Sequence, residues 1–253
     1  MAKAPVTIKA LEEIALMREG GKKLAAVMKK LKATALPNTS TAALNALAEK
    51  LIIGSGAQLA FKGYQNFPAA ICTSVNEEVV HCVPYEGRVL QEGDIVGIDI
   101  GLIYKGFYLD MAETVGIGAV SFEAQRLMRV TKKALRLGIN KTRPGATTGD
   151  IGNTVQRFVE SQGFNVVREF VGHGIGRELH EDPRVPNFGK RREGEALKPG
   201  MVIAIEPIVT VGSYKLKKLP DGHGVATADG SLAAHFEHTV AVTENGHETL
   251  TAV

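Results

Sequence analysis

The stretch Asp94–Val115, which reads DIVGIDIGLIYKGFYLDMAETV, constrains the fold more than any other part of the sequence. It contains two apolar runs, Ile95–Ile103 and Phe107–Val115, separated by a turn-like Tyr-Lys-Gly. Short runs rich in Ile, Val, Tyr and Phe that break at a glycine are typical of a β-hairpin. The runs are apolar at alternate and at intervening positions, which predicts strands that are covered on both faces.

Each predicted strand of this hairpin carries one carboxylate, Asp99 or Asp110. An ionised carboxylate inside a covered sheet is costly unless it is neutralised or paired. If the chain turns at Lys105, the two carboxylates lie near each other and repel unless a cation lies between them. In the alternative, each aspartate accepts hydrogen bonds from backbone N–H groups near the turn. The hairpin alone does not distinguish these interpretations.

The whole sequence narrows the class of protein. Its 253 residues can form one large domain or two small ones. No apolar run approaches the ~20 residues of a membrane-spanning helix, and the N-terminus lacks the apolar segment of a secretory signal. We therefore expect a cytoplasmic protein in which Cys72 and Cys82 stay reduced. The net charge of +3 does not indicate nucleic-acid binding, and the basic clusters are most simply solvated surface; contact with an RNA-rich partner is the less favoured alternative.

The order of the predicted elements suggests an internal repeat. Two helices precede the first set of strands, and two more helices precede a second set. This order predicts one domain over residues 1–253 with two pseudo-symmetric halves, roughly 1–118 and 119–253. A strand over Val79–Val83 is expected to contain His81. The predicted helix caps are Thr7, Thr39 or Ser40, Ser121 and Thr148.

The second half carries charged residues in apolar surroundings, as the hairpin does. His173 lies between two glycines, which allow close approach of backbone or ligand, and His180 follows seven residues later. Glu206 and Glu237 lie within the apolar runs MVIAIEPIV and AAHFEHTVAV. Each residue alone is explained by a buried hydrogen bond. Together with the hairpin aspartates they favour an oxygen-rich site for a divalent cation, and bridging carboxylates suit a pair of ions. Without a metal such a core would be implausible.

These segments together resemble the methionine aminopeptidases of type I over nearly the full chain. By that resemblance the metal ligands are Asp99, Asp110, His173, Glu206 and Glu237, within DIGLIYKGFYLD, GHGIG, IEP and FEHT. The segment SVNEEVVHCVP matches the family's segment with a catalytic histidine, here His81, and GHGIGRELHEDP carries the second, His180. Matches at so many positions in separated segments make the resemblance specific.

The resemblance implies an α+β fold, the pseudo-twofold pita-bread fold, in which helices cover a curved antiparallel sheet. It also implies two divalent ions, of Co, Mn, Fe or Zn, on the inner face of the sheet. The chain lacks the long helical insertion that the type II branch has between His180 and Glu206. It also lacks a cysteine-rich N-terminal extension, which makes it similar to the bacterial enzymes.

The implied activity is removal of the N-terminal methionine from nascent proteins and peptides. A hydroxide bridging the two metals is expected to attack the first peptide bond. Glu206 is expected to carry the proton from the nucleophile to the leaving amine, and His180 to polarise the carbonyl or stabilise the oxyanion. His81 is expected to orient the substrate through the neighbouring amide. The pocket for the methionine side chain is expected to be lined by Phe61, Tyr64, Phe67, Cys72 and Leu179, and the alternative for each is plain core packing.

The sequence departs from the family pattern at four positions outside the metal ligands. Cys82 replaces a Gly, His235 a common Gln, Val225 a Trp at the pocket rim, and Ala233 a Ser that helps to hold a monovalent cation in some relatives. The sequence therefore does not predict whether a monovalent cation binds. No role follows from the sequence for His223, His235 or His247, and His238 is expected at most to support Glu237 by a hydrogen bond.

Two alternatives to methionine removal remain. An aminopeptidase that acts on Xaa-Pro bonds would use the same five ligands, but such relatives usually carry an additional N-terminal domain, whereas this chain begins almost directly with the peptidase helices. An inactive binding protein of the same fold would have lost ligands, and all five are present. We expect a monomer with no membrane partner and no specific nucleic-acid partner, and leave brief contact with the ribosome open.

Overall fold

The computed structural model describes residues 6–252, and this part of the chain contains four long helices. They are α1 (Leu11–Thr34), α2 (Thr41–Gly54), α3 (Phe122–Ile139) and α4 (Thr148–Ser161). The hydroxyls of Ser40 and Ser121 accept hydrogen bonds from the third residue of α2 and α3, which confirms those predicted caps.

Two predicted caps were wrong. Thr147, not Thr148, caps α4, because its hydroxyl accepts from Asp150 N while the Asp150 carboxylate accepts from Thr147 N. Thr7 does not cap α1, since its hydroxyl donates to Glu181, far along the chain. At the start of α1 the Ala10 N–H instead donates to Glu13 at 2.9 Å.

Within residues 6–252 the main sheet has nine strands, and every pair in it is antiparallel. The order is β1 (Gln58–Leu59), β4 (Ile95–Tyr104), β5 (Phe107–Gly116), β14 (Glu237–Thr243), β9 (Val202–Ile205), β7 (Gly172–Gly174) and β8 (Glu181–Val185), with β2 (Ile71–Val75) on β4 and β15 (Gly246–Thr249) on β14. Two smaller sheets are formed by β13 (Ala233–His235), β10 (Ile208–Thr210) and β6 (Asn165–Val166), and by β11 (Leu216–Lys218), β12 (Val225–Thr227) and β3 (Glu78–Val80). The hairpin of β4 and β5 matches its prediction to within a residue at each end.

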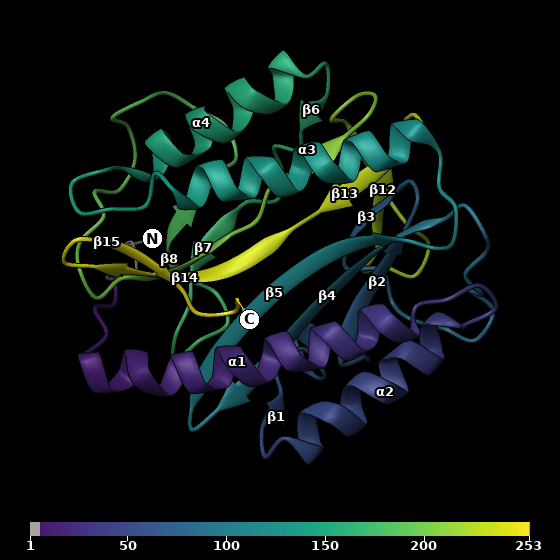
Figure 1. Ribbon diagram of the computed structural model, residues 1–253, viewed down its shortest axis with the longest axis horizontal. Coiled ribbons are helices and arrows are strands. Elements are labelled where there is room, and N and C mark those ends of the chain that lie inside the picture. The colour runs from purple at the N-terminus through teal and green to yellow at the C-terminus, as the bar shows by residue number, and fades with distance from the viewer. Residues whose placement is uncertain (1–5, 253) are drawn as a thin grey trace.

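The helices cover one face of the main sheet, as Figure 1 shows. Alternate residues of β4, such as Ile98 and Ile100, point outward into a buried apolar cluster with α1 and α2. Ile203 and Ile205 of β9 do the same with α3 and α4. The intervening residues of β4, including Asp99, therefore face away from the helices. This arrangement confirms the expected α+β class with an antiparallel sheet covered by helices.

The predicted division into halves at residues 118 and 119 stays a prediction, and its outer ends at residues 1 and 253 lie outside the described residues. No helix in the described part of the chain combines the length and apolar character needed to cross a membrane.

Candidate active site

Three strands of the main sheet place carboxylates in one row. Asp99 on β4 pairs with Ala112 on β5, which pairs with Glu237 on β14. Directly opposite residues on neighbouring strands project to the same face, so Asp99 and Glu237 flank the small Ala112. Asp110 lies two residues before Ala112 on β5 and projects to that face as well. The hairpin aspartates therefore lie near each other, as expected.

Glu206 and His173 reach the same place from β9 and β7. Ile205 pairs with His238, so the next residue, Glu206, emerges beside Glu237. The ring Nδ1 of His173 lies 2.9 Å from the Gly174 carbonyl oxygen. A carbonyl only accepts, so Nδ1 carries the proton and the lone pair of Nε2 is free for a metal. That Nε2 lies 3.8 Å from Glu206 Oε1.

The glycines around His173 have a structural reason. A Cβ on Gly172 would lie 2.3 Å from the Ala204 carbonyl oxygen, and one on Gly174 would lie 2.2 Å from that of Asp182. Only glycine lets β7 lie this close to β9 and β8. The expected close approach is therefore made by neighbouring backbone.

The donor set fits a divalent metal ion. The ligand atoms of Asp110, His173 and Glu237 lie within 4.8 Å of one another. Among the described residues, Asp99 Oδ1, Asp110 Oδ1 and Glu237 Oε1 are buried and have no hydrogen-bond partner. Buried carboxylate oxygens are costly when left unpaired, and a divalent cation would satisfy all three. Carboxylates with one imidazole suit Mn, Fe, Co or Zn.

The carboxylates hold protons in the absence of a cation. Burial raises the pKa of Asp99 to about 7. Burial and the charge of Asp99 raise the pKa of Glu206 to about 8. Burial and repulsion from their neighbours raise the pKa of Asp110 and of Glu237 well above the ordinary range. Metal binding at neutral pH should therefore release protons.

In the metal-free protein, the free energy of unfolding should decrease as the pH rises from 6.5 to 8. The carboxylates have raised pKa values, so the folded state binds more protons than the unfolded state, and their contribution declines through this window. The buried histidines have pKa values lowered by burial, to about 3 for His173 and about 4 for His180, and reduce stability only below their ordinary 6.5. Each proton that the folded state holds in excess of the unfolded state lowers the free energy of unfolding by about 2 kcal/mol across this window, or Tm by about 4–8 °C.

Thermal melts of chelator-treated protein at both pH values test this expectation. The variant Glu206→Gln, which lacks one of the two carboxylates that titrate in the window, should show a shallower slope. A Tm that stays equal or rises between pH 6.5 and 8 would contradict it.

The two predicted catalytic histidines face the cavity that these carboxylates line, which has a volume of about 430 Å³. His180 Nδ1 lies 2.7 Å from the Tyr64 hydroxyl, and its ring centroid is 4.4 Å from that of His173. His81 was expected within a strand, but β3 ends at Val80 and His81 adopts φ +59°. A side chain is strained in that left-handed region, and such strain often occurs at functional sites.

All five residues predicted for the methionine pocket line the same cavity: Phe61, Tyr64, Phe67, Cys72 and Leu179. Gly101 makes room for one wall, because a Cβ there would lie 2.6 Å from Phe61 Cε1. Burial and the nearby Asp99 raise the pKa of the Cys72 thiol well above its usual range, so the thiol is neutral. Both cysteines are free, as expected.

The residues that depart from the family pattern lie in different parts of the structure. Val225 was expected at the pocket rim, but its side chain is buried beside Val80 in a separate apolar cluster. His223 lines the cavity instead. Its ring is perpendicular to that of Phe67, with 5.6 Å between the ring centroids. Cys82 is buried, and its Sγ lies 3.5 Å from the Val80 carbonyl oxygen.

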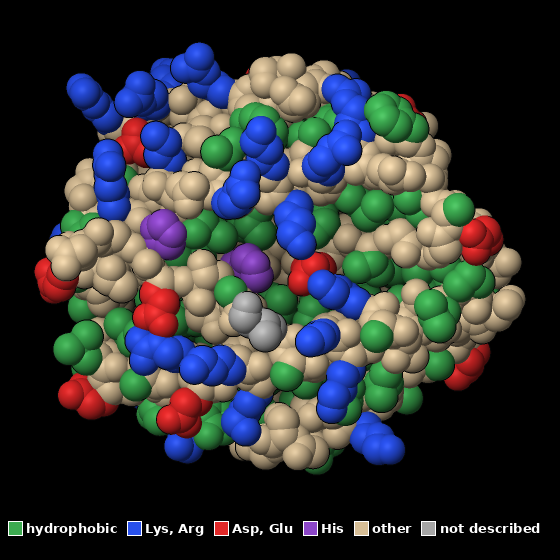
Figure 2. All heavy atoms as spheres, in the orientation of Figure 1, with side chains coloured by type: hydrophobic (Ala, Val, Ile, Leu, Met, Phe, Trp, Pro, Cys, Tyr) green, Lys and Arg blue, Asp and Glu red, His purple; other side chains and the backbone are tan. Residues whose placement is uncertain are grey.

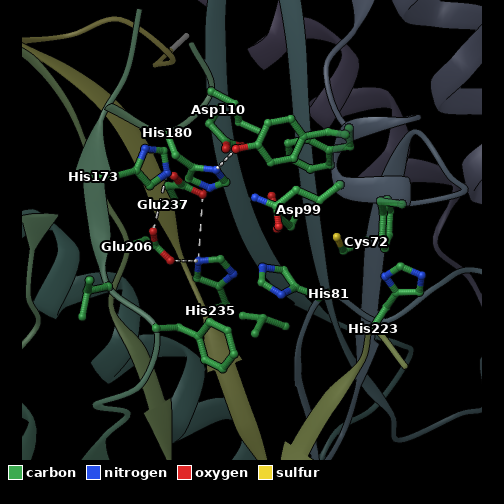
Figure 3. A pocket seen from close by; sticks show the side chains of 18 of the residues that line it. Cys72, His81, Asp99, Asp110, His173, His180, Glu206, His223, His235 and Glu237 are labelled. Carbon is green, nitrogen blue, oxygen red and sulfur yellow. Dashed lines mark hydrogen bonds and ion pairs between the residues drawn. The ribbon is translucent and has the colours of Figure 1, made fainter. Parts of the chain in front are cut away.

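His235 also lines the cavity, and the sequence analysis gave it no role. Its Nε2 lies 3.6 Å from Glu206 Oε2 and 3.9 Å from Glu237 Oε2 (Figure 3). Its position two residues before Glu237 in an apolar run is the signal that could have placed it on the same face.

Comparison with known proteins identifies the family. The model of metallopeptidase family M24 matches residues 15–244. A methionine aminopeptidase from Clostridium perfringens is 48% identical over 250 residues, which cover 98% of this chain and 99% of that protein. Methionine aminopeptidase 1 from Bacillus subtilis is 45% identical over 248 residues, which cover 98% of this chain and 100% of that protein.

Solved structures agree with this assignment. The crystal structure of a methionine aminopeptidase from Thermotoga maritima superimposes with a TM-score of 0.97 at 42% identity, covering 98% of this chain and 100% of that one. A prolidase from Pyrococcus furiosus, at 24% identity and a TM-score of 0.78, covers 97% of this chain and 65% of its own, and shares the pita-bread fold alone. The chain belongs to metallopeptidase family M24 and, within it, to the methionine aminopeptidases of the bacterial type.

Proposed function

We propose that this protein is a metal-dependent aminopeptidase that removes the N-terminal methionine from peptides and nascent proteins. One observation carries the proposal: the carboxylates and imidazoles of a divalent-metal site open into a cavity with aromatic and aliphatic walls. The high identity to methionine aminopeptidases over almost the whole chain supports the same substrate.

The site would hold two divalent ions, of Co, Mn, Fe or Zn. Their ligands would be Asp99, Asp110, His173, Glu206 and Glu237. When bound, such ions supply an activated water and a Lewis acid for the substrate carbonyl.

Glu206 would carry a proton from the attacking water to the leaving amine. It lines the cavity, with Oε1 toward His173 and Oε2 toward His235. A carboxylate that borders both the metal site and the substrate cavity can accept a proton and then donate it.

His180 would stabilise the negative charge that develops on the scissile carbonyl oxygen. When the Tyr64 hydroxyl donates to Nδ1, Nε2 of the neutral ring carries the remaining proton and serves as a donor. His81, which lines the same cavity, would contact the amide next to the scissile bond and orient the substrate.

The apolar part of the cavity would accept the methionine side chain. The flexible thioether fits the soft, aromatic surface that Phe61, Tyr64 and Phe67 provide together with Cys72 and Leu179. None of these five side chains carries a charge that would favour a polar first residue.

A peptide assay with controlled metal content tests the function. The protein is stripped with a chelator, and Co, Mn, Fe or Zn is added back separately. Release of the first residue is then followed from Met-Ala-Ser and Ala-Pro-Ala. We expect metal-dependent release of methionine alone. Release from the proline peptide alone would support the Xaa-Pro alternative, and no release with any metal would favour a binding protein.

We further propose that the protein acts in the cytoplasm as a monomer and meets its substrates at the ribosome. Figure 2 shows Lys and Arg side chains along α1 and α3 on one face, where Lys29, Lys32, Arg129 and Lys132 line shallow grooves. Such a face would attract the phosphates of ribosomal RNA without reading sequence.

Binding to ribosomes should therefore be strong at low salt and weaken steeply as salt rises. Cosedimentation at about 50 mM and about 200 mM salt measures this dependence. Failure to cosediment at the lower concentration would contradict the proposed contact.

A further inference from the structure

His235 presents a buried ring nitrogen to two of the proposed metal ligands. Nε2 lies 3.6 Å from Glu206 Oε2 and 3.9 Å from Glu237 Oε2, and Figure 3 shows the imidazole beside both carboxylates. These distances exceed those of a hydrogen bond. Nε2 is buried and has no hydrogen-bond partner among the described residues. A buried ring nitrogen without a partner needs an explanation.

The backbone fixes where this ring can go. The Thr114 hydroxyl on β5 donates to the His235 carbonyl and accepts from the His235 N–H, both at 2.9 Å. His235 also pairs with Ile208 across the small sheet. Phe236, the next residue, is buried, and Glu237 follows on the same face as His235. These contacts hold the backbone of His235 in place, with its side chain on the face that Glu237 shares.

Glu206 lies between two imidazoles that contact different oxygens. Oε1 faces His173 Nε2 at 3.8 Å, and Oε2 faces His235 Nε2 at 3.6 Å. The two rings differ in their other contacts, because His173 Nδ1 is hydrogen-bonded to the Gly174 carbonyl, which leaves Nε2 as an acceptor. His235 Nε2 can instead act as a donor, and the Glu206 carboxylate is its nearest acceptor.

We propose that His235 is a positioning residue whose Nε2–H donates to Glu206 Oε2 in the metal-loaded protein and so keeps Oε1 turned toward His173. The proposal rests on the proposed role of Glu206 as a metal ligand. Hydrogen bonds to ligating carboxylates fix their orientation, and losing such a partner typically weakens metal binding about 10- to 100-fold. The nitrogen and oxygen need to approach by only about half an ångström to reach hydrogen-bond distance.

Metal titration of the stripped protein tests the proposal. Affinities for Mn and Co are measured by calorimetry, and the visible spectrum of the Co form reports its coordination. His235→Ala should weaken binding about 10- to 100-fold and change the spectrum. His235→Gln, which keeps an N–H donor, should restore affinity to within about threefold. His223→Ala is the control, because His223 lines the same cavity and no carboxylate of the described chain lies within 4 Å of its ring nitrogens.

Each other result overturns the proposal. Unchanged affinity in His235→Ala would show that Glu206 needs no such donor. Equal losses in the Ala and Gln variants would show that the imidazole is itself a ligand. Absence of metal binding by the unmodified protein would also overturn it. If His235→Ala does not fold, as judged by circular dichroism, His235→Phe takes its place, because it keeps a ring and removes the donor.

Methionine release by the unmodified protein is measured beside the titrations. Failure of that assay with the expected metal affinities would overturn the proposed function and leave the positioning role supported.

Discussion

Replacing Asp110 with Asn is expected to lower methionine release by about 10³-fold or more and to weaken metal binding. Asp110 Oδ1 is buried and unpaired, and the residue belongs to the tight cluster with His173 and Glu237. The amide is nearly isosteric with the carboxylate but lacks the charge that balances a divalent ion. Metal ions stabilise the transition state by several kcal/mol, and each 1.36 kcal/mol of that stabilisation corresponds to a tenfold change in rate.

The same substitution should not destabilise the metal-free protein. Burial and repulsion from Asp99 and Glu206 raise the pKa of Asp110, so its charge is unfavourable without a cation. The chelator-treated Asp110→Asn variant should therefore melt at or above the unmodified protein at pH 8, and only the gain in Tm from added metal should disappear. This pattern separates loss of a ligand from loss of the fold.

Glu113→Gln is the matched control for Asp110→Asn. Glu113 lies three residues further along β5 and faces the other side of the sheet, where it accepts from Lys32 at 2.7 Å. Its loss should leave methionine release and metal affinity within about twofold, because an ion pair near the surface contributes little. An Asp110→Asn variant that kept a tenth of the activity with full metal binding would contradict the proposed ligand set.

The hairpin shows how far local sequence can predict this site. The two apolar runs and the turn at Lys105 predicted that Asp99 and Asp110 lie near each other, and the observed pairing puts both on one face. The helix starts at Ser40 and Ser121 follow from capping chemistry that involves only neighbouring residues.

Features set by distant contacts were not predictable from the sequence. Thr7 has the chemistry of a cap, but Glu181 binds its hydroxyl from the other half of the chain. The sequence predicts His81 within a strand, whereas β3 ends one residue earlier and the His81 backbone adopts the left-handed conformation. Local propensity carries no information about such tertiary contacts.

The cavity rim and His235 illustrate the same limit. Val225 pairs with Val80 between two small strands and is buried there, so that Val80 lines the cavity and Val225 does not. The spacing of two residues indicates that His235 and Glu237 share a face, but nothing local in the sequence shows that Glu206 lies beside both of them.

Replacing His180 with Ala is expected to lower kcat by about 10²- to 10³-fold, the usual cost of losing one donor to a developing oxyanion. The KM for Met-Ala-Ser should change little, because the interaction strengthens only in the transition state. Metal affinity should stay the same, since His180 is not among the proposed ligands. Steady-state kinetics and metal titration of the same preparation measure all three quantities.

Tyr64→Phe provides a graded companion to His180→Ala. The Tyr64 hydroxyl lies 2.7 Å from His180 Nδ1, and its donation keeps the other ring nitrogen protonated and aimed at the substrate. Loss of one neutral hydrogen bond of about 1 kcal/mol should reduce kcat about fivefold, far less than loss of the imidazole. If both variants instead raised KM and kept kcat, His180 would bind the substrate in its ground state, and the oxyanion would need another donor. If His180→Ala lowered metal affinity as much as Asp110→Asn, His180 would act through the metal site, and His173 would have to share its role as the imidazole ligand.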